Sequence, residues 1–233
     1  MAESSIHKEH RKRVKERFRK EGLDGFTPVQ VLELLLFYVI PRKDTNEIAH
    51  YLLNRFGSLS MVLEAPMEEL MKVEGIGPEA AQFLHMMPAV GRRYLVDKTM
   101  QSKVLKTIDQ CGQYFLPYFF GRKVETVFLL CLDAKCKVLS CREVGEGSVN
   151  SAGISIRKIV EMALAANATS VVLAHNHPSG VAIPSYEDVQ TTHRIADALR
   201  TVDVHLVDHI VVAEDDYVSM VYSGHRFDGT QSY

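Results

Sequence analysis

Residues 170–190 read SVVLAHNHPSGVAIPSYEDVQ. The apolar run at the start predicts a buried strand, which ends at Pro178 because proline cannot donate to a sheet. His175 and His177 lie two positions apart at this strand end, so both imidazoles face one side. A loop then leads into a helix whose first turn contains Asp188. Two histidines and one aspartate meeting there would form a zinc site with a fourth position left for water.

Part of this pattern also has a purely structural interpretation. Ser185 and Asp188 have the spacing of a helix N-cap and an acidic third residue, a local device that needs no metal. The two interpretations are compatible, because a capped helix start is a rigid support for a metal ligand.

The same residues resemble the metal-binding motif of the JAMM (MPN-plus, JAB) metallopeptidases, H-x-H-x7-S-x2-D, and the HNHPSG wording resembles the bacterial RadC branch. The resemblance implies an α/β sandwich with a mixed sheet, of the cytidine-deaminase-like kind. It implies that His175, His177 and Asp188 hold Zn2+ and that Ser185 donates a hydrogen bond to the developing oxyanion. It also implies a glutamate that acts as general base.

Glu125 is the candidate for this base, since it opens an apolar strand in the context ETVFLLCL, which partly resembles the corresponding family strand. Glu143 and Glu146 are the alternatives, on the next strand and in the loop beyond it. His193 lies within two turns of Asp188 and could support it, but His193, His205 and His209 are each expected to be ordinary surface or core histidines.

Composition indicates an ordinary globular protein, with 233 residues, 46% hydrophobic residues and a net charge of −2. No apolar run approaches the roughly 20 residues that cross a membrane, and the polar, basic start lacks a signal-peptide core. We therefore expect a cytoplasmic protein without a membrane partner. Its four cysteines lack a CxxC pair and are expected to be buried thiols rather than a disulfide or a second metal site.

Residues 1–97 are predicted to form an all-α domain. A basic helix over 6–20 is followed by an apolar helix over 29–40 and shorter helices up to residue 73. The turn at Gly75, Ile76 and Gly77 resembles a helix-hairpin-helix motif, and the domain resembles the helical domain of RadC proteins. In such motifs the turn contacts DNA phosphates, and the basic segment could do the same. A tight turn between core helices and a solvated basic helix explain the two features equally well.

Residues 105–233 form the second predicted domain, after a polar linker near 98–104. We expect a helix over 108–119 with a buried aromatic stripe, and a helix on either side of the histidine strand. The sheet is expected to contain strands 125–132 and 138–144, the histidine strand, a short strand 204–207, and a final hairpin of 209–213 and 217–221. The chain is thus predicted to be an α+β protein.

Two functions follow from these features. The first is a zinc-dependent hydrolase that cleaves an amide or isopeptide bond in a peptide or protein substrate, as the family resemblance implies. The second is a DNA-binding accessory protein of repair or recombination, with a structural or nuclease-type metal site. Three converging ligands favour the enzyme, because structural zinc sites normally have four protein ligands.

Overall fold

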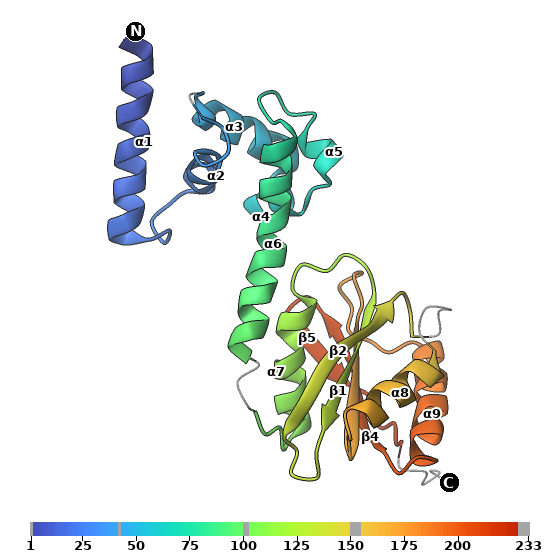
Figure 1. Cartoon of the computed structure of the whole chain (residues 1–233). Coiled ribbons are helices and arrows are strands. Elements are labelled where there is room, and N and C mark those ends of the chain that lie inside the picture. Colours follow the sequence, from blue (N-terminus) through green and yellow to red (C-terminus); the bar gives the residue numbers. More distant parts are fainter. Residues whose placement is uncertain (1, 42, 100–102, 150–154, 228–233) are drawn as a thin grey trace. The chain divides into compact units, whose positions relative to one another are not determined.

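The computed structural model describes residues 2–41, 43–99, 103–149 and 155–227 (Figure 1). Contacts within the chain divide it into two units, Met1–Gly91 and Arg92–Tyr233. The boundary between the units falls inside a long helix rather than in the predicted linker, whose residues 100–102 lie outside the described residues. In the described part of the chain, no helix is both long and apolar enough to span a bilayer.

The first unit is entirely helical in its described residues. Its short helices bury an aliphatic core that includes Leu32, Leu52 and Leu84. Thr27, Asp44 and Ser58 cap three of the helices with their side chains, which explains where those helices begin. The helices are α1 (Ala2–Glu21), α2 (Pro28–Leu36), α3 (Thr45–Phe56), α4 (Leu59–Glu64), α5 (Met67–Leu70) and the start of α6 (Pro78–Thr99).

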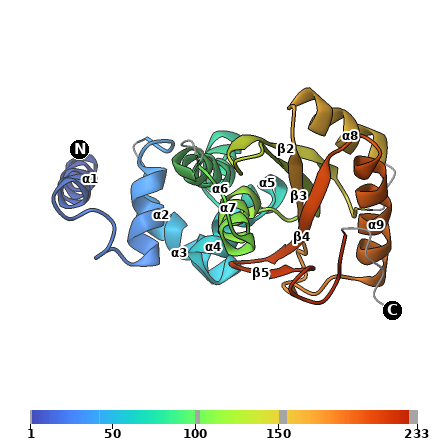
Figure 2. The same ribbon diagram turned by 90° about the horizontal axis from the view of Figure 1, so that it is seen from below.

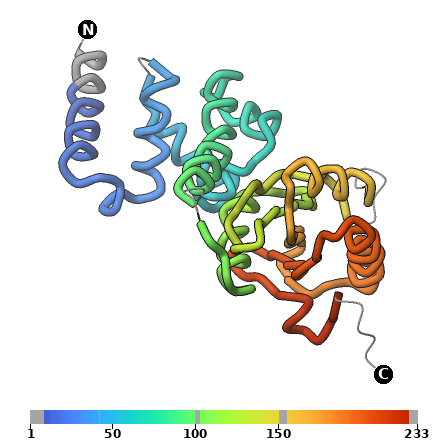
Figure 3. Tube along the Cα trace, turned by 60° about the horizontal axis from the view of Figure 1, so that its bottom comes forward, coloured from blue at the N-terminus to red at the C-terminus, as the bar shows by residue number. Residues whose placement is uncertain are grey.

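Helix α2 is shorter than predicted, because it ends at Leu36 and not at residue 40. The backbone N–H groups of the tight turns that follow bond to the last carbonyl oxygens of the helix. Beyond the helix end, Arg11 of α1 donates to the carbonyl oxygens of Phe37 and Ile40 and so holds the segment that follows α2. Helix α1 lies beside α2, as the tube in Figure 3 shows.

Part of the basic character of α1 therefore serves packing within the unit. Besides Arg11, the Arg17 guanidinium stacks over Phe26 and donates to the carbonyl oxygen of Gly25. Lys15 also takes part, since its ammonium lies over the rings of Phe37 and Tyr38. Among the α1 residues whose burial the structure describes, the exposed cations of α1 are Lys12, Arg13, Arg19 and Lys20.

The turn predicted to be a helix-hairpin-helix element joins α5 to α6. Gly75 has a φ of +89°, and a Cβ there would lie 2.6 Å from the Cδ1 of Ile48. Ile76 is buried in the core of the unit. The glycine and the isoleucine thus have packing roles, and DNA contact by this turn stays a prediction.

The second unit contains a five-stranded mixed sheet with the order β2-β1-β3-β4-β5. Only β3 and β4 run parallel, and the other neighbouring strands are antiparallel. The strands are β1 (Thr126–Leu132), β2 (Val138–Glu146), β3 (Ser170–Asn176), β4 (His205–Ala213) and β5 (Asp216–Ser219).

Helices cover both faces of this sheet, with α7 (Ile108–Phe119) on one side and α8 (Ile156–Ala165) and α9 (Tyr186–Arg200) on the other (Figure 2). All residues of β1 are buried, as expected for a strand between two helical layers. Alternate residues face opposite layers: Leu129 packs toward α8 and α9, whereas Phe128 packs against the aromatic stripe of α7. The predicted stripe is confirmed as buried at Cys111, Tyr114, Phe115, Tyr118 and Phe119.

The prediction of two strands over 204–213 was wrong, because β4 is one continuous strand. Its pairing with β3 is irregular between Leu206 and Asp208, the partners of Val171 and Val172. The two predicted strands leave out Asp208, whose fully buried carboxylate accepts hydrogen bonds from the Ser219 hydroxyl and from the backbone N–H groups of His209 and Val221. An acidic residue can thus lie inside a strand when its oxygens are satisfied. Burial nevertheless raises the pKa of Asp208.

Candidate metal centre

Three predicted ligands meet at the carboxyl end of β3. The Nε2 atoms of His175 and His177 lie 2.9 Å apart, and each is 3.6 Å from the Oδ2 atom of Asp188. Donor atoms about 2.0–2.1 Å from a tetrahedral zinc ion are separated by roughly 3.3 Å, so this triangle has the right size. Among the described residues, these three form the group of histidine, cysteine and acidic side chains able to hold a metal ion.

Hydrogen bonds on the far side of each ring orient the two imidazoles. The Nδ1 of His177 lies 3.0 Å from the carbonyl oxygen of Val181, which can only accept, so this nitrogen carries the proton. The Nδ1 of His175 contacts the buried His209 at 2.8 Å. His177 therefore directs its Nε2 lone pair toward the carboxylate, and the three possible ligand atoms converge on one point, as a cation site requires.

Asp188 is both the third residue of α9 and the acidic member of the site. Ser185 caps the helix, since its Oγ accepts from the Asp188 N–H, and the Oδ2 of Asp188 accepts from the Ser185 N–H and hydroxyl. Burial opposes ionisation, but the hydrogen bonds that the Asp188 carboxylate accepts from the Ser185 N–H and hydroxyl favour the charged form, and the pKa of Asp188 lies well below its ordinary value. The helix cap and the metal-ligand arrangement thus coexist.

Glu125 is fixed beside this group by the residue between the two histidines. The side chain of Asn176 accepts from the Thr126 N–H at 2.8 Å and donates to the Val124 carbonyl at 3.2 Å, so it holds both neighbours of Glu125. The Glu125 carbonyl accepts from the Gly147 N–H. Val127 pairs with His175, and continuing this register places Glu125 opposite His177.

A hollow of about 340 Å³ connects these groups. Glu125, His177, Ser185 and Asp188 all line it, so the predicted base shares this hollow with two of the predicted ligands, while His175 is buried behind it. Its remaining lining residues are Ser148, Ser179 and Glu187.

The alternative bases lie outside this lining. Glu143 accepts a hydrogen bond from Arg122 at 2.8 Å, and Glu146 lies 4.0 Å from the same guanidinium. Both carboxylates thus pair with Arg122, whereas Glu125 lines the hollow beside the ligand group.

The sequence interpretation missed two residues behind the histidines. His209 and Thr192 are fully buried, and they connect His175 to the backbone of α9. Complete burial holds the pKa of His209 well below its ordinary value, and the adjacent His175 adds to this effect. His193, the candidate from sequence, instead packs against Phe227 with ring centroids 5.1 Å apart. Only the pairing of β4 with β3, which a sequence does not give, places His209 there.

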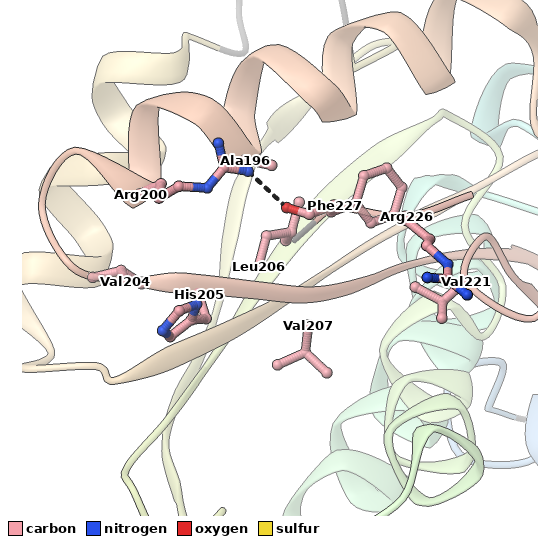
Figure 4. A pocket seen from close by; sticks show the side chains of 9 residues that line it. All are labelled: Ala196, Arg200, Val204, His205, Leu206, Val207, Val221, Arg226 and Phe227. Atoms are coloured by element: carbon pink, nitrogen blue, oxygen red, sulfur yellow. Dashed lines mark hydrogen bonds between the residues drawn. The ribbon is translucent and has the colours of Figure 1, made fainter. Parts of the chain in front are cut away.

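A larger hollow of about 460 Å³ lies at the opposite end of β4 (Figure 4). Arg200 and His205 line it, and Arg200 donates to the carbonyl oxygen of Phe227. His205 pairs with Ser170 at the start of β3, far along the strand from His175. This hollow is therefore separate from the ligand group.

Comparison with known proteins agrees with these features. Residues 105–225 match the family model described as the RadC-like JAB domain. The chain is also 36% identical to a UPF0758 protein of Paraburkholderia phytofirmans, over 90% of this chain and 81% of that protein. The chain belongs to the RadC-like JAB domain family. A UPF0758 protein of Fusobacterium nucleatum is 32% identical over 92% of this chain and 96% of its own length, and one of Ruegeria pomeroyi is 33% identical over 95% and 99%.

Membership in the RadC-like JAB family suggests a JAMM-type metal-dependent hydrolase. The matched segment contains β1 to β5 and every residue of the ligand group. The relatives cover nearly the whole chain, so the similarity extends into the helical first unit.

Proposed function

We propose that this protein is a zinc-dependent hydrolase that cleaves an amide bond in a peptide or protein, with a metal-activated water as nucleophile. The observation that carries the proposal is the open three-donor group of His175, His177 and Asp188 beside a hollow that also contains a carboxylate. A structural zinc site would close the fourth position with a protein ligand.

Each residue then has a distinct role. The two Nε2 atoms and the Asp188 carboxylate would hold the ion, which would supply Lewis acidity that lowers the pKa of a bound water toward about 7. Glu125 lies within the same hollow, takes the proton of the attacking water and returns it to the leaving amine. Ser185 donates its hydroxyl hydrogen to the developing oxyanion.

The surroundings of the site favour a peptide over a phosphodiester. Among the described residues, the lining of the hollow contains two further carboxylates, Glu125 and Glu187, and no arginine or lysine. Phosphoryl chemistry relies on cationic side chains around the transferred group, and this lining would repel a nucleic acid backbone.

Apolar side chains on the loop between the ligands provide a surface for a peptide. Val181, Ile183 and Tyr186 are 52%, 69% and 74% exposed, although each is large and apolar or aromatic. Such a concentration of exposed apolar groups within six residues is typical of a contact surface. We infer that side chains of the substrate pack on this loop while its backbone enters the hollow.

The alternative of a DNA-binding accessory protein rests on the exposed cations of α1, the one specific observation in its favour. In the turn before α6, Gly75 and Ile76 are accounted for by packing. The hydrolase therefore has the stronger support.

Elemental analysis of the purified chain tests the metal. We expect about one zinc per chain in the wild type and loss of the metal in Asp188→Ala. Digestion of a peptide library, read by mass spectrometry, then tests the chemistry. Glu125→Gln should retain zinc and lose cleavage, while Glu143→Gln, the matched control on the Arg122 side, should keep both. Wild type without zinc, or full cleavage by Glu125→Gln, would overturn the respective assignment.

A further inference from the structure

A chain of buried hydrogen bonds connects the backbone of α9 to the ligand His175. The Thr192 Oγ1 lies 2.6 Å from the carbonyl oxygen of Asp188 and 2.6 Å from the Nδ1 of His209. The Nε2 of His209 lies 2.8 Å from the Nδ1 of His175. All these side chains are buried, with at most 1% exposure for Thr192, His209 and His175, so solvent cannot replace any of these bonds.

The direction of every bond in this chain follows from its first acceptor. A carbonyl oxygen can only accept, so the single hydroxyl hydrogen of Thr192 is donated to Asp188. The Thr192 oxygen must then accept from His209, which places the His209 proton on Nδ1. A neutral imidazole with its proton on Nδ1 has a lone pair on Nε2, so His209 accepts from the Nδ1–H of His175.

We propose that Thr192 and His209 are positioning residues that fix the tautomer of His175, so that its Nε2 lone pair faces the metal position. The inference rests on the proposed metal site. Asp188 acts at both ends of the arrangement, because its carboxylate belongs to the site while its carbonyl sets the direction of the bonds behind His175.

Loss of the Thr192 hydroxyl should reverse the direction of the hydrogen bond between His209 and His175. In Thr192→Val the Nδ1–H of His209 has no acceptor in a dry environment, which favours the other tautomer with the proton on Nε2. That proton would face the Nδ1 of His175, so His175 would have to accept there and carry its own proton on Nε2. The metal-facing lone pair is then lost.

The first readout is zinc affinity of the full-length protein, measured by competition with a chromophoric chelator. We expect Thr192→Val to bind zinc about 10- to 100-fold more weakly, the usual effect of removing a group that orients a metal-binding histidine. Thr192→Ser, which keeps the hydroxyl, should restore the wild-type affinity. Thr191→Val is the matched control, since it removes the hydroxyl of the neighbouring, also buried threonine of α9 and should leave zinc affinity unchanged.

The second readout is the tautomer itself, from the nitrogen chemical shifts and two-bond N–H couplings of 15N-histidine-labelled, metal-free protein. His175 should carry its proton on Nδ1 in the wild type and in Thr192→Ser, and on Nε2 in Thr192→Val. If Thr192→Val does not fold, His209→Gln and His209→Leu replace it. The side-chain oxygen of glutamine can accept the Nδ1–H of His175 and should preserve the His175 tautomer, whereas leucine offers no acceptor.

The two readouts separate the positioning inference from the proposed function. An unchanged His175 tautomer and unchanged zinc affinity in Thr192→Val would overturn the roles of Thr192 and His209. Wild-type protein that binds no zinc but shows the expected tautomers would refute the hydrolase and support the hydrogen-bond chain.

Discussion

The substitution Asn176→Ala should separate metal binding from the positioning of the base. Asn176 is buried and makes two hydrogen bonds to the backbone on either side of Glu125. Alanine leaves the Thr126 N–H without an acceptor in a fully buried residue, which costs about 1–3 kcal/mol, and the lost bond to Val124 adds about 1 kcal/mol. We therefore expect the unit to lose roughly 2–4 kcal/mol of unfolding free energy.

Scanning calorimetry should show this loss as a decrease of about 10 °C in the unfolding midpoint of the second unit, at about 2–4 °C per kcal/mol. The metal ligands of Asn176→Ala remain in place, so its zinc content should equal that of the wild type. With Glu125 released from its backbone anchors, the turnover of a peptide substrate should fall by about 10²-fold, since a displacement near 1 Å has effects of this size. An unchanged midpoint, or wild-type turnover in a destabilised variant, would refute the role given to Asn176.

Four other predictions follow from the same structure. At pH 8 a thiol reagent should label only Cys136 in the folded protein, because the other three cysteines are buried. Burial also raises the pKa of these three thiols, to about 12 for Cys111, so they are not ionised at this pH. Fast labelling of more than one thiol would contradict this. Gly75→Ala should lower the unfolding free energy by about 1–3 kcal/mol, as judged by urea titration, because of its positive φ and the clash with Ile48. Ser185→Ala should keep its zinc but lose about 10²-fold in kcat, and equal kcat would exclude the oxyanion role. The alternative function predicts that DNA affinity in a filter-binding assay falls steeply between about 50 and 200 mM salt. It also predicts that binding disappears when the exposed cations of α1 are replaced by alanine. Salt-independent binding would exclude phosphate contacts.

Much of the ligand group could be predicted from sequence because its spacing is local. His175 and His177 belong to one strand end, and Ser185 and Asp188 belong to one helix start. The helix limits 108–119 agree for the same reason, because a capping threonine and an aromatic stripe mark that helix in the sequence.

The remaining features depend on contacts between distant segments. The sequence predicts two strands on either side of Asp208, where the structure has the single strand β4. No local pattern shows that Ser219 and two backbone N–H groups satisfy the buried Asp208 carboxylate. The segment after α2 is held by Arg11, which lies 26 residues before Phe37, whose carbonyl oxygen it binds, so no local pattern shows this contact. The sequence predicts only a surface or core histidine at position 209. The register between β3 and β4 places His209 against His175, and its neighbours in the sequence do not indicate this contact.

The hydrogen bonds of Asp188 indicate how Ser185 can act both as helix cap and as oxyanion donor. Oδ2 accepts the Ser185 N–H and hydroxyl and also faces both histidine Nε2 atoms at 3.6 Å. A carboxylate oxygen has about two lone-pair sites, so a cation at this position competes with one of the two hydrogens. The N–H is fixed by the start of α9, whereas the hydroxyl can rotate. Its oxygen still accepts the Asp188 N–H, so the cap persists while the hydrogen turns toward the hollow that Ser185 shares with Glu125. Metal binding would thus release the donor that the developing oxyanion needs.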